Sequence, residues 1–578
     1  MGMKDGGGRW SFLRLQGDHT MLLWAVVAGL AGALATAAFR EAIDLLQRMI
    51  GSRPGDFVQM ARHLPWPLRF ALPAAGGVIA GLCLVIAQKR PSPKGGADYM
   101  DVIVVGNGAI PVWQSLWRSL SSLFSIASGG SIGREGPMVQ LAALCASLIG
   151  RVVRFDTARL RVLVACGGAA GITSAYNAPI AGAFFICELV LGSMAMEWFG
   201  PILVACVVAN IAMRKLGGYH PPYEMPAFPA IEGMEVVPFV LLGLLCGVLA
   251  PLFLRTITVS KRWVAGFTMP LPVKLGYGGL AVGFVSIWVP EVWGNGYEVV
   301  SALLHNPWTW QALLLVLAAK IVATMASVGS GAVGGVFTPT LFVGAVLGNL
   351  IGLGVHAMWP AAAAAPYAYA MVGMGAFLAA ATNAPMMAIL MIFEMTLSYQ
   401  IVLPLMLSSV LAYFVARSTQ QTVMYEVTER RQHDLRDRLR LAETRMADLL
   451  RPAETVVPLT AGLDEMMSMF TAHSVKYLYV TDEEGGFRGV VALRELTTYL
   501  HSGGEGRSMA ADFLTPGFYV LTSDMSLTDA LHLFREFKGE RLPVINDKLM
   551  SRHLLGVVHK TALLDAYVRL GPAPAASR

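Results

Sequence analysis

Charged side chains are scarce in this chain. Asp, Glu, Lys and Arg make up 14% of its 578 residues, hydrophobic residues make up 55%, and the mean hydropathy is +0.56. A soluble globular protein carries roughly 25% charged residues, so this composition excludes an ordinary soluble protein. The net charge of +6 is explained by Lys and Arg in cytoplasmic loops, so the sequence predicts no nucleic-acid partner.

Disulfide patterns, metal motifs and enzyme motifs are also absent. The six cysteines lie inside apolar segments and lack the spacing of a disulfide framework or a zinc site. The chain has no Walker loop, no HExxH motif and no histidine cluster in an apolar segment. We therefore expect no metal, no cofactor and no enzymatic activity.

Long apolar runs take the place of charge. They cover residues 21–39, 236–255, 311–326, 367–393 and 401–416, and each is about long enough to cross or nearly cross a hydrocarbon core of roughly 30 Å. These runs predict a polytopic α-helical protein that passes through the lipid bilayer several times. Basic residues before the first run predict a cytoplasmic N-terminus. A signal peptide is the weaker interpretation, because many more spans follow.

The C-terminal part has a different composition. Residues 426–452 are rich in charge and predict a helical linker. Residues 453–570 contain two copies of one pattern, a β-rich run, an acidic turn and Gly-Val-Val, each after an apparent helix. This order predicts two tandem β-α-β-β-α units in the cytoplasm. The last residues, 571–578, are expected to be disordered.

A second repeat lies within the apolar part. The segments NAPIAGAFFICE (177–188) and NAPMMAILMIFE (383–394) both begin with Asn-Ala-Pro and end on a glutamate at the same spacing. Glycine-rich breaks, GSIGREGP (130–137) and GSGAVGGVFTP (329–339), precede them in corresponding places. Interrupted apolar segments at matching positions of two halves indicate the binding site of a transporter.

The chemistry of these breaks favours an anion. Irregular backbone at membrane depth is tolerated where it lines a pathway, and a helix that begins there presents unpaired amide N–H groups at its positive end. The amides of Val336 and Phe337 are expected to do so. Glu135 lies at the corresponding helix end, where its carboxylate would compete with an anion until it is protonated or moves away. Alternatively, Glu135 only caps its helix and pairs with Arg134.

These motifs together resemble the CLC family of chloride channels and chloride/proton antiporters. The resemblance rests on GREGP, GGVFTP, both Asn-Ala-Pro segments, FEMTLSYQIVLPL (393–405), the tyrosine of TVMYEV, and a C-terminal part that resembles a pair of CBS domains. It implies an antiparallel, inverted-repeat membrane domain of two halves over 1–425, followed by the linker and an α/β CBS domain pair. It also implies a homodimer with one anion pathway in each subunit.

The resemblance assigns roles to particular residues. Glu135 would be the gating glutamate. The implied anion-binding residues are Gly133, Arg134, Gly136, Val336, Phe337, Tyr425 and Ala97. Tyr425 would offer its hydroxyl to the anion. From its residue type alone, Tyr425 is equally well explained as an aromatic anchor at the membrane interface. Ala97, in GGADYM (95–100), stands where the family has a serine. One hydroxyl ligand is therefore missing, and the preference for chloride over nitrate or bromide stays open.

Proton coupling depends on one position after the first Asn-Ala-Pro segment. Proton-coupled members have a glutamate there, and this chain has Leu189, which cannot carry a proton. Glu188 and Glu197 are the candidate substitutes through water. The loss favours a chloride channel of the voltage-gated or pH-gated type. The alternative is a chloride/proton antiporter on the same scaffold.

The resemblance also implies a location and a role for the CBS pair. The expected location is the bacterial inner (cytoplasmic) membrane, with both termini in the cytoplasm and chloride as the transported ion. CBS pairs that bind adenine nucleotides have an Asp that holds the ribose, and here only Thr561 remains of that pattern. We therefore expect a scaffold for dimerisation or gating. Fluoride exporters of the family depart from GREGP at the proline, which Pro137 retains.

Overall fold

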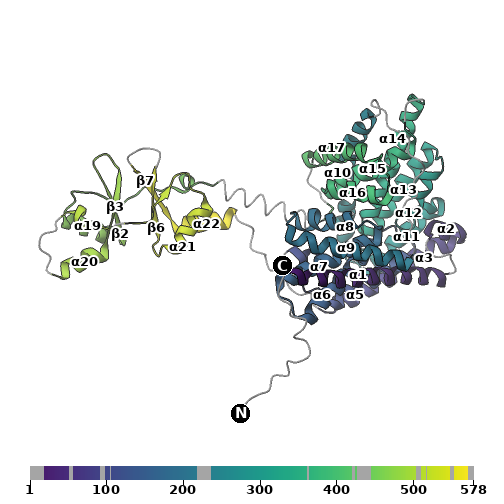
Figure 1. The fold of residues 1–578 in the computed structure, drawn as a ribbon, viewed down its shortest axis with the longest axis horizontal. Coiled ribbons are helices and arrows are strands. Elements are labelled where there is room, and N and C mark those ends of the chain that lie inside the picture. Colours follow the sequence, from purple (N-terminus) through teal and green to yellow (C-terminus); the bar gives the residue numbers. More distant parts are fainter. Residues whose placement is uncertain are drawn as a thin grey trace, which may run out of the picture. The chain divides into compact units, whose positions relative to one another are not determined.

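The chain folds into two units, each described here by itself. The computed structural model describes residues 18–50, 56–90, 98–104, 106–217, 236–360, 364–419, 424–425, 444–502, 509–515, 517–546 and 552–570. The units are residues 1–428 and 429–578 (Figure 1). In the described residues the first unit is helical and the strands lie in the second. Of the predicted segments, linker residues 426–443 and the tail 571–578 lie outside the described residues.

Nine helices of the described residues are long and apolar enough to cross a membrane. They are α1 (Asp18–Met49), α3 (Trp66–Gln88), α6 (Glu135–Val153), α9 (Met196–Gly217), α10 (Val236–Ala265), α11 (Leu271–Trp288), α13 (Trp310–Gly329), α14 (Phe337–Met358) and α17 (Val402–Thr419). Other helices are α2 (Phe57–His63), α4 (Tyr99–Val104), α5 (Val112–Ala127), α7 (Thr157–Tyr176), α8 (Pro179–Phe184), α12 (Tyr297–His305), α15 (Pro366–Thr382) and α16 (Pro385–Thr396). A π-helix, η2 (Phe185–Leu191), continues α8, and a short 3₁₀ turn, η4 (Pro290–Val292), follows α11.

The packing of the first unit repeats itself. Helix α6 packs against α7 as α14 packs against α15, and α7 packs against α9 as α15 packs against α17. Helix α1 contacts α7 and α9, and α10 contacts α15 and α17 in the same way. The first unit is therefore built from two structurally similar halves, as the paired motifs predict.

The Asn-Ala-Pro segments end one helix and begin the next. Asn177 and Asn383 close α7 and α15 in the left-handed conformation, with φ of 55° and 57°. Asparagine tolerates this conformation, and the proline two residues later fits the first turn of a new helix, where no amide hydrogen is needed. The same Asn-Ala-Pro sequence therefore begins α8 in one half and α16 in the other.

Each half caps the short helix of the other half. The carboxylate of Glu394, at the end of the second segment, accepts the amides of Ile180 and Ala181 at 2.9 and 2.7 Å, in the first turn of α8. Glu188, at the end of the first segment, accepts the amides of Met386 and Met387 at 3.2 and 2.7 Å, in α16. Both glutamates therefore satisfy unpaired N–H groups at a helix N-terminus.

The second unit has the predicted tandem pattern. Its first sheet has the order β1 (Val456–Pro458), β2 (Tyr477–Thr481), β3 (Phe487–Ala492), β4 (Leu514–Thr515), and its second the order β5 (Leu521–Thr522), β6 (Arg541–Asn546), β7 (His553–His559). In each sheet the first strand pairs parallel and the next antiparallel. The helices are α19 (Leu463–His473), α20 (Leu493–His501), α21 (Leu527–Glu536) and α22 (Lys560–Leu570), with 3₁₀ turns η5 (Met446–Leu449) and η6 (Ala510–Phe513).

The first residues of this unit belong to its core. Met446 of η5 is fully buried in the cluster formed by the second β-α-β-β-α repeat. Arg451 pairs with Val557 through two backbone hydrogen bonds of 2.9 Å. Residues 444–452 are thus part of the folded unit, and the prediction that the linker runs to 452 extends it too far.

Candidate anion site

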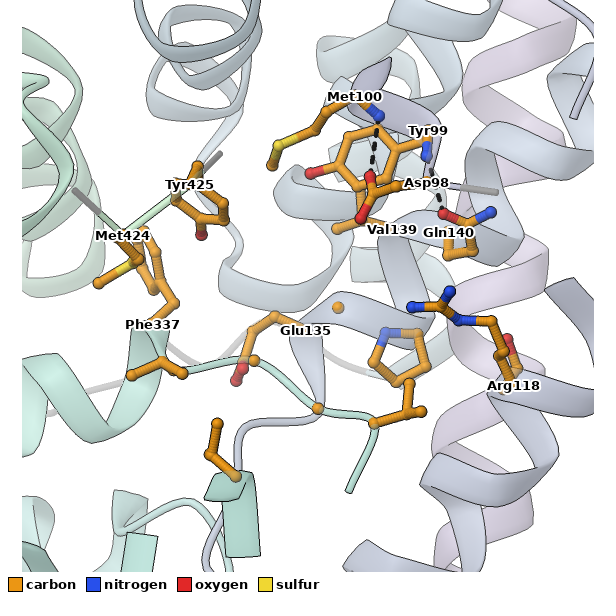
Figure 2. Close-up of a pocket in the computed structure, with 18 of the residues that line it drawn as sticks. Asp98, Tyr99, Met100, Arg118, Glu135, Val139, Gln140, Phe337, Met424 and Tyr425 are labelled. Carbon is orange, nitrogen blue, oxygen red and sulfur yellow. Dashed lines mark hydrogen bonds between the residues drawn. The ribbon is translucent and has the colours of Figure 1, made fainter. Parts of the chain in front are cut away.

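A cavity of about 560 Å³ lies where the two glycine-rich breaks meet (Figure 2). It is lined from α5, α6, η2, α10 and α14, from the break at 331–336, and from the segments that contain Asp98 and Tyr425. The lining residues used below are Asp98, Tyr99, Asp101, Arg118, Glu135, Gly136, Phe185, Lys261, Val336, Phe337 and Tyr425.

The two breaks are joined to each other by backbone hydrogen bonds. The amide of Gly133 donates to the carbonyl of Gly335 at 2.8 Å, and the amide of Gly335 donates to the carbonyl of Gly133 at 2.9 Å. Helix α6 begins two residues after Gly133, and α14 begins two residues after Gly335. The bridge therefore brings the positive N-terminal ends of α6 and α14, one from each half, to the same cavity.

Glu135 is the first residue of α6 and folds back over this bridge. Its side chain is 4% exposed, and its Oε1 accepts a hydrogen bond of 2.5 Å from the Thr338 hydroxyl in the first turn of α14. Because that hydroxyl donates to Glu135, the Tyr176 hydroxyl, 3.0 Å from Thr338, is the donor in the next hydrogen bond. Oε2 has no hydrogen-bond partner in the described part of the chain. The carboxylate thus occupies one end of the cavity without being fully satisfied.

The carboxylate fits there because both bridge residues are glycine. A Cβ atom on Gly133 would collide with Oε2 of Glu135, and one on Gly335 would lie 3.1 Å from the same oxygen. Further back, Gly129 has φ +99°, and a Cβ there would meet the ring of Trp293. The glycines of the first break are therefore required for the close approach of backbone and carboxylate.

A buried lysine holds the turn behind the first break. Lys320 of α13 is fully buried, and its ammonium donates to the carbonyls of Val292 and Gly294 at 2.9 and 2.8 Å. These carbonyls flank Trp293, whose ring lies against Gly129. A lysine at this depth in a membrane unit is costly to bury, and its two hydrogen bonds order the turn that supports the break.

Tyr425 lies across the cavity from α4, after the end of α17. The amide of its neighbour, Met424, donates to the carbonyl of Ala381 at 3.3 Å, near the end of α15. The rings of Tyr425 and Phe185 meet edge to face at 6.1 Å, and Phe185 in turn contacts Phe337 at 6.3 Å. These contacts fix a phenol at the cavity wall, with the first turn of α14 on the same side (Figure 2).

Two residues that sequence reasoning missed lie opposite Tyr425. Asp98 and Tyr99 come directly after Ala97, and both line the cavity. The Tyr99 amide donates to the Gln140 side chain of α6 at 3.0 Å. The family pattern concerns only the position of the missing serine, which is Ala97. The acid and the phenol in the next two positions are not part of that pattern and so were not predicted.

The other predicted anion-site residues are distributed differently. Gly136, Val336 and Phe337 line the cavity, whereas Ala97 lies outside the described residues. Gly133 is not part of the described lining, because its amide is bonded to Gly335. Of the predicted anion-binding residues, Gly133 therefore has its amide engaged in the bridge between the two breaks.

Arg134, like Gly133, is placed differently from the prediction. It is not part of the described lining and interacts electrostatically with Asp44 of α1 and Glu298 of α12. Its inclusion among the anion-binding residues is therefore not supported. The alternative in which Arg134 pairs with Glu135 has no salt bridge between the two among the described side chains.

The residues predicted for proton transfer lie outside the cavity as described. Leu189 in η2 is 1% exposed. Glu188 has both carboxylate oxygens on the amides of α16, and Glu197, in the first turn of α9, is exposed. Glu188 and Leu189 both lie in the π-helix η2, which turns more widely than an α-helix.

Comparison with known proteins agrees with this architecture. The family model described as voltage gated chloride channel matches residues 75–417, which is more than half of the chain. The chain belongs to the CLC family. The CBS domain model matches residues 446–502 and 510–569, so this CLC protein carries a C-terminal CBS pair.

Individual CLC relatives match the membrane part. A ClcB-like chloride channel protein of Ralstonia nicotianae is 54% identical over 425 residues, which are 73% of this chain and 99% of the relative. The voltage-gated ClC-type chloride channel ClcB of Salmonella dublin is 39% identical over 411 residues, 70% of this chain and 97% of the relative.

Solved CLC structures have the same fold. A slow cyanobacterial Cl⁻/H⁺ antiporter matches with a TM-score of 0.64 at 25% identity, over 72% of this chain and 98% of that one. A eukaryotic CLC transporter matches with a TM-score of 0.61 at 19% identity, over 94% and 97% of the two chains. The protein is accordingly a multi-pass membrane protein of a family of chloride channels and transporters.

Proposed function

We propose that this protein is a chloride channel whose conduction is gated by Glu135. The observation that carries the proposal is the position of the Glu135 carboxylate, which lies in the cavity where the N-termini of α6 and α14 meet. An anion attracted by these helix ends would compete with the carboxylate for the same space. Protonation of Glu135, or its movement away from Thr338, would open the path.

Passive conduction is favoured over proton exchange by the residues around η2. Leu189 offers no titratable group, and Glu188 is bound to the backbone of α16 through both oxygens. The alternative is a chloride/proton antiporter, which the description of the cyanobacterial relative supports for that protein. The two mechanisms differ in whether chloride flow moves protons.

The test uses purified protein in liposomes with a chloride gradient and no pH gradient. Internal pH is followed beside chloride efflux, and a protonophore separates leak from coupled flow. A channel releases chloride without driving protons uphill. Proton movement at a fixed ratio to chloride would reject the channel in favour of the antiporter.

The gate has its own test in the same liposomes. Glu135→Gln mimics the protonated acid, so we expect fast chloride efflux that no longer rises steeply on acidification. Glu197→Gln is the matched control, because this acid is exposed and lies outside the described cavity lining. If Glu135→Gln keeps the full acid activation of the natural chain, Glu135 is not the gate.

We further propose a homodimer in a bacterial cytoplasmic membrane, with both termini in the cytoplasm. The CBS pair then acts as a dimerising or gating-coupled scaffold, and no cofactor is needed besides the transported chloride. Sequence similarity to bacterial chloride channels supports the location.

A further inference from the structure

A second carboxylate lines the cavity that contains Glu135. Asp98 precedes α4 and lies on the side of the cavity opposite Tyr425 (Figure 2). Asp98, Glu135 and Tyr425 all line this one cavity. Glu135 occupies its end of that space with a buried Oε2 that lacks a partner in the described residues. The lining of this cavity as described therefore contains Asp98 and Asp101 besides Glu135.

Asp98 has a hydrogen-bond donor at its carboxylate and shares its cavity with two basic side chains. Its Oδ1 accepts a hydrogen bond of 2.9 Å from the amide of Met100 in α4. Arg118 of α5 and Lys261 of α10 line the same cavity. Hydrogen bonds to the charged form and nearby positive charges both stabilise a carboxylate.

An anion that enters the cavity reverses this balance. Like charges repel strongly where a cavity wall replaces much of the water between them, because the effective dielectric constant is lower than in bulk solvent. The repulsion acts on the ionised form of Asp98 and is relieved when Asp98 takes up a proton. Binding of the anion and binding of the proton then strengthen each other by the same factor.

The other charged groups around α4 do not replace Asp98 in this role. Glu188 of η2 is bound to α16, and Arg161 of α7 donates to the carbonyls at the opposite end of α4. Asp101 lies on α4 itself and also lines the cavity, so it is the acid that an experiment must separate from Asp98.

We propose that Asp98 is a proton-binding residue of the anion pathway, and that it takes up a proton when chloride enters the cavity. This inference rests on the chloride pathway proposed above. It applies to passive conduction and to exchange alike, because it concerns the occupied site and not the direction of flow. It also adds a titratable group to the pathway besides Glu135, which Leu189 does not supply.

The test measures chloride binding to the purified full-length protein by calorimetry between about pH 5 and pH 8. The background variant is Glu135→Gln, which removes the first acid. In this variant we expect chloride affinity to fall roughly tenfold as pH rises through the titration of Asp98. In the double variant E135Q/D98N the affinity should be independent of pH and as high as the acid-side value of E135Q.

The control is E135Q/D101N, which changes the other acid of α4 and should keep the pH dependence. If it loses that dependence while E135Q/D98N keeps it, Asp101 is the proton site and the proposal is wrong. Asn at position 98 retains an oxygen that can accept the Met100 amide, so the start of α4 is preserved.

A second measurement does not depend on the folding of any Asp98 variant. Chloride binding to E135Q is repeated in buffers with different ionisation enthalpies, which reports the protons taken up for each anion bound. Proton uptake is expected, and its absence overturns the proposal. Failure of chloride to bind to the natural chain and to every variant would instead reject the proposed chloride pathway.

Discussion

At the scale of single residues, two phenols define the cavity wall. Tyr425 and Tyr99 both line the cavity and lie on opposite sides of it (Figure 2). The alanine at position 97 removes the hydroxyl that other CLC members place near the anion, and Tyr99 brings another hydroxyl to the same cavity from two residues further on. Tyrosine can therefore perform the donor role that serine performs elsewhere.

Removing either hydroxyl should weaken the preference for chloride. We expect Tyr425→Phe and Tyr99→Phe each to cost about 1 kcal/mol of chloride binding, or roughly a fivefold loss of affinity. The ring remains in both variants, so packing against Phe185 and α7 is kept. The measurement is the relative flux of chloride and nitrate through liposomes.

Tyr413→Phe serves as the control for both variants, because its hydroxyl accepts from Arg417 in α17 and lies outside the described lining. A Tyr99→Phe protein with unaltered flux ratios would show that Tyr99 does not compensate for Ala97.

At the scale of elements, the sequence predicts the breaks but not their partners. Glycine and Asn-Ala-Pro patterns are local signals, so the starts of α6, α8, α14 and α16 could be read from them. The Gly133–Gly335 bridge and the exchanged caps join residues about 200 positions apart, and no local pattern specifies such pairs. Asp98 was missed for a related reason, since only the folded chain shows that it shares a cavity with Glu135.

The exchanged caps lead to a prediction about stability. Glu188→Gln and Glu394→Gln each replace a carboxylate that accepts two amides by a neutral amide with one acceptor oxygen. We expect each change to destabilise the first unit by about 1 to 2 kcal/mol. The melting temperature of detergent-purified protein should fall for both variants alike, because the two sites are equivalent.

Glu197→Gln is again the control and should leave the melting temperature unchanged. Altered proton movement in Glu188→Gln at an unchanged melting temperature would contradict the structural role and return Glu188 to the candidates for proton transfer.

At the scale of the whole molecule, the membrane unit and the CBS pair differ in what they contribute. The relatives from Ralstonia and Salmonella are matched over 97% to 99% of their length by 411 to 425 residues, so they correspond to the first unit by size. The cavity, both halves and every residue assigned to it lie before residue 428. The described lining of the cavity therefore contains no residue of the second unit.

We accordingly expect a chain that ends at Thr428 to transport chloride. It retains Tyr425 and the bond between Met424 and Ala381, so the cavity wall stays in place. Chloride efflux and its acid activation should both persist in liposomes. Loss of transport by a shortened chain that still melts cooperatively would mean that the CBS pair holds the gate.

The CBS pair itself is expected to bind no adenine nucleotide. Adding millimolar ATP should therefore not shift the melting temperature of the full-length protein. An ATP-induced rise in the melting temperature would identify that pair as a nucleotide sensor, because a ligand that binds only the folded state stabilises it.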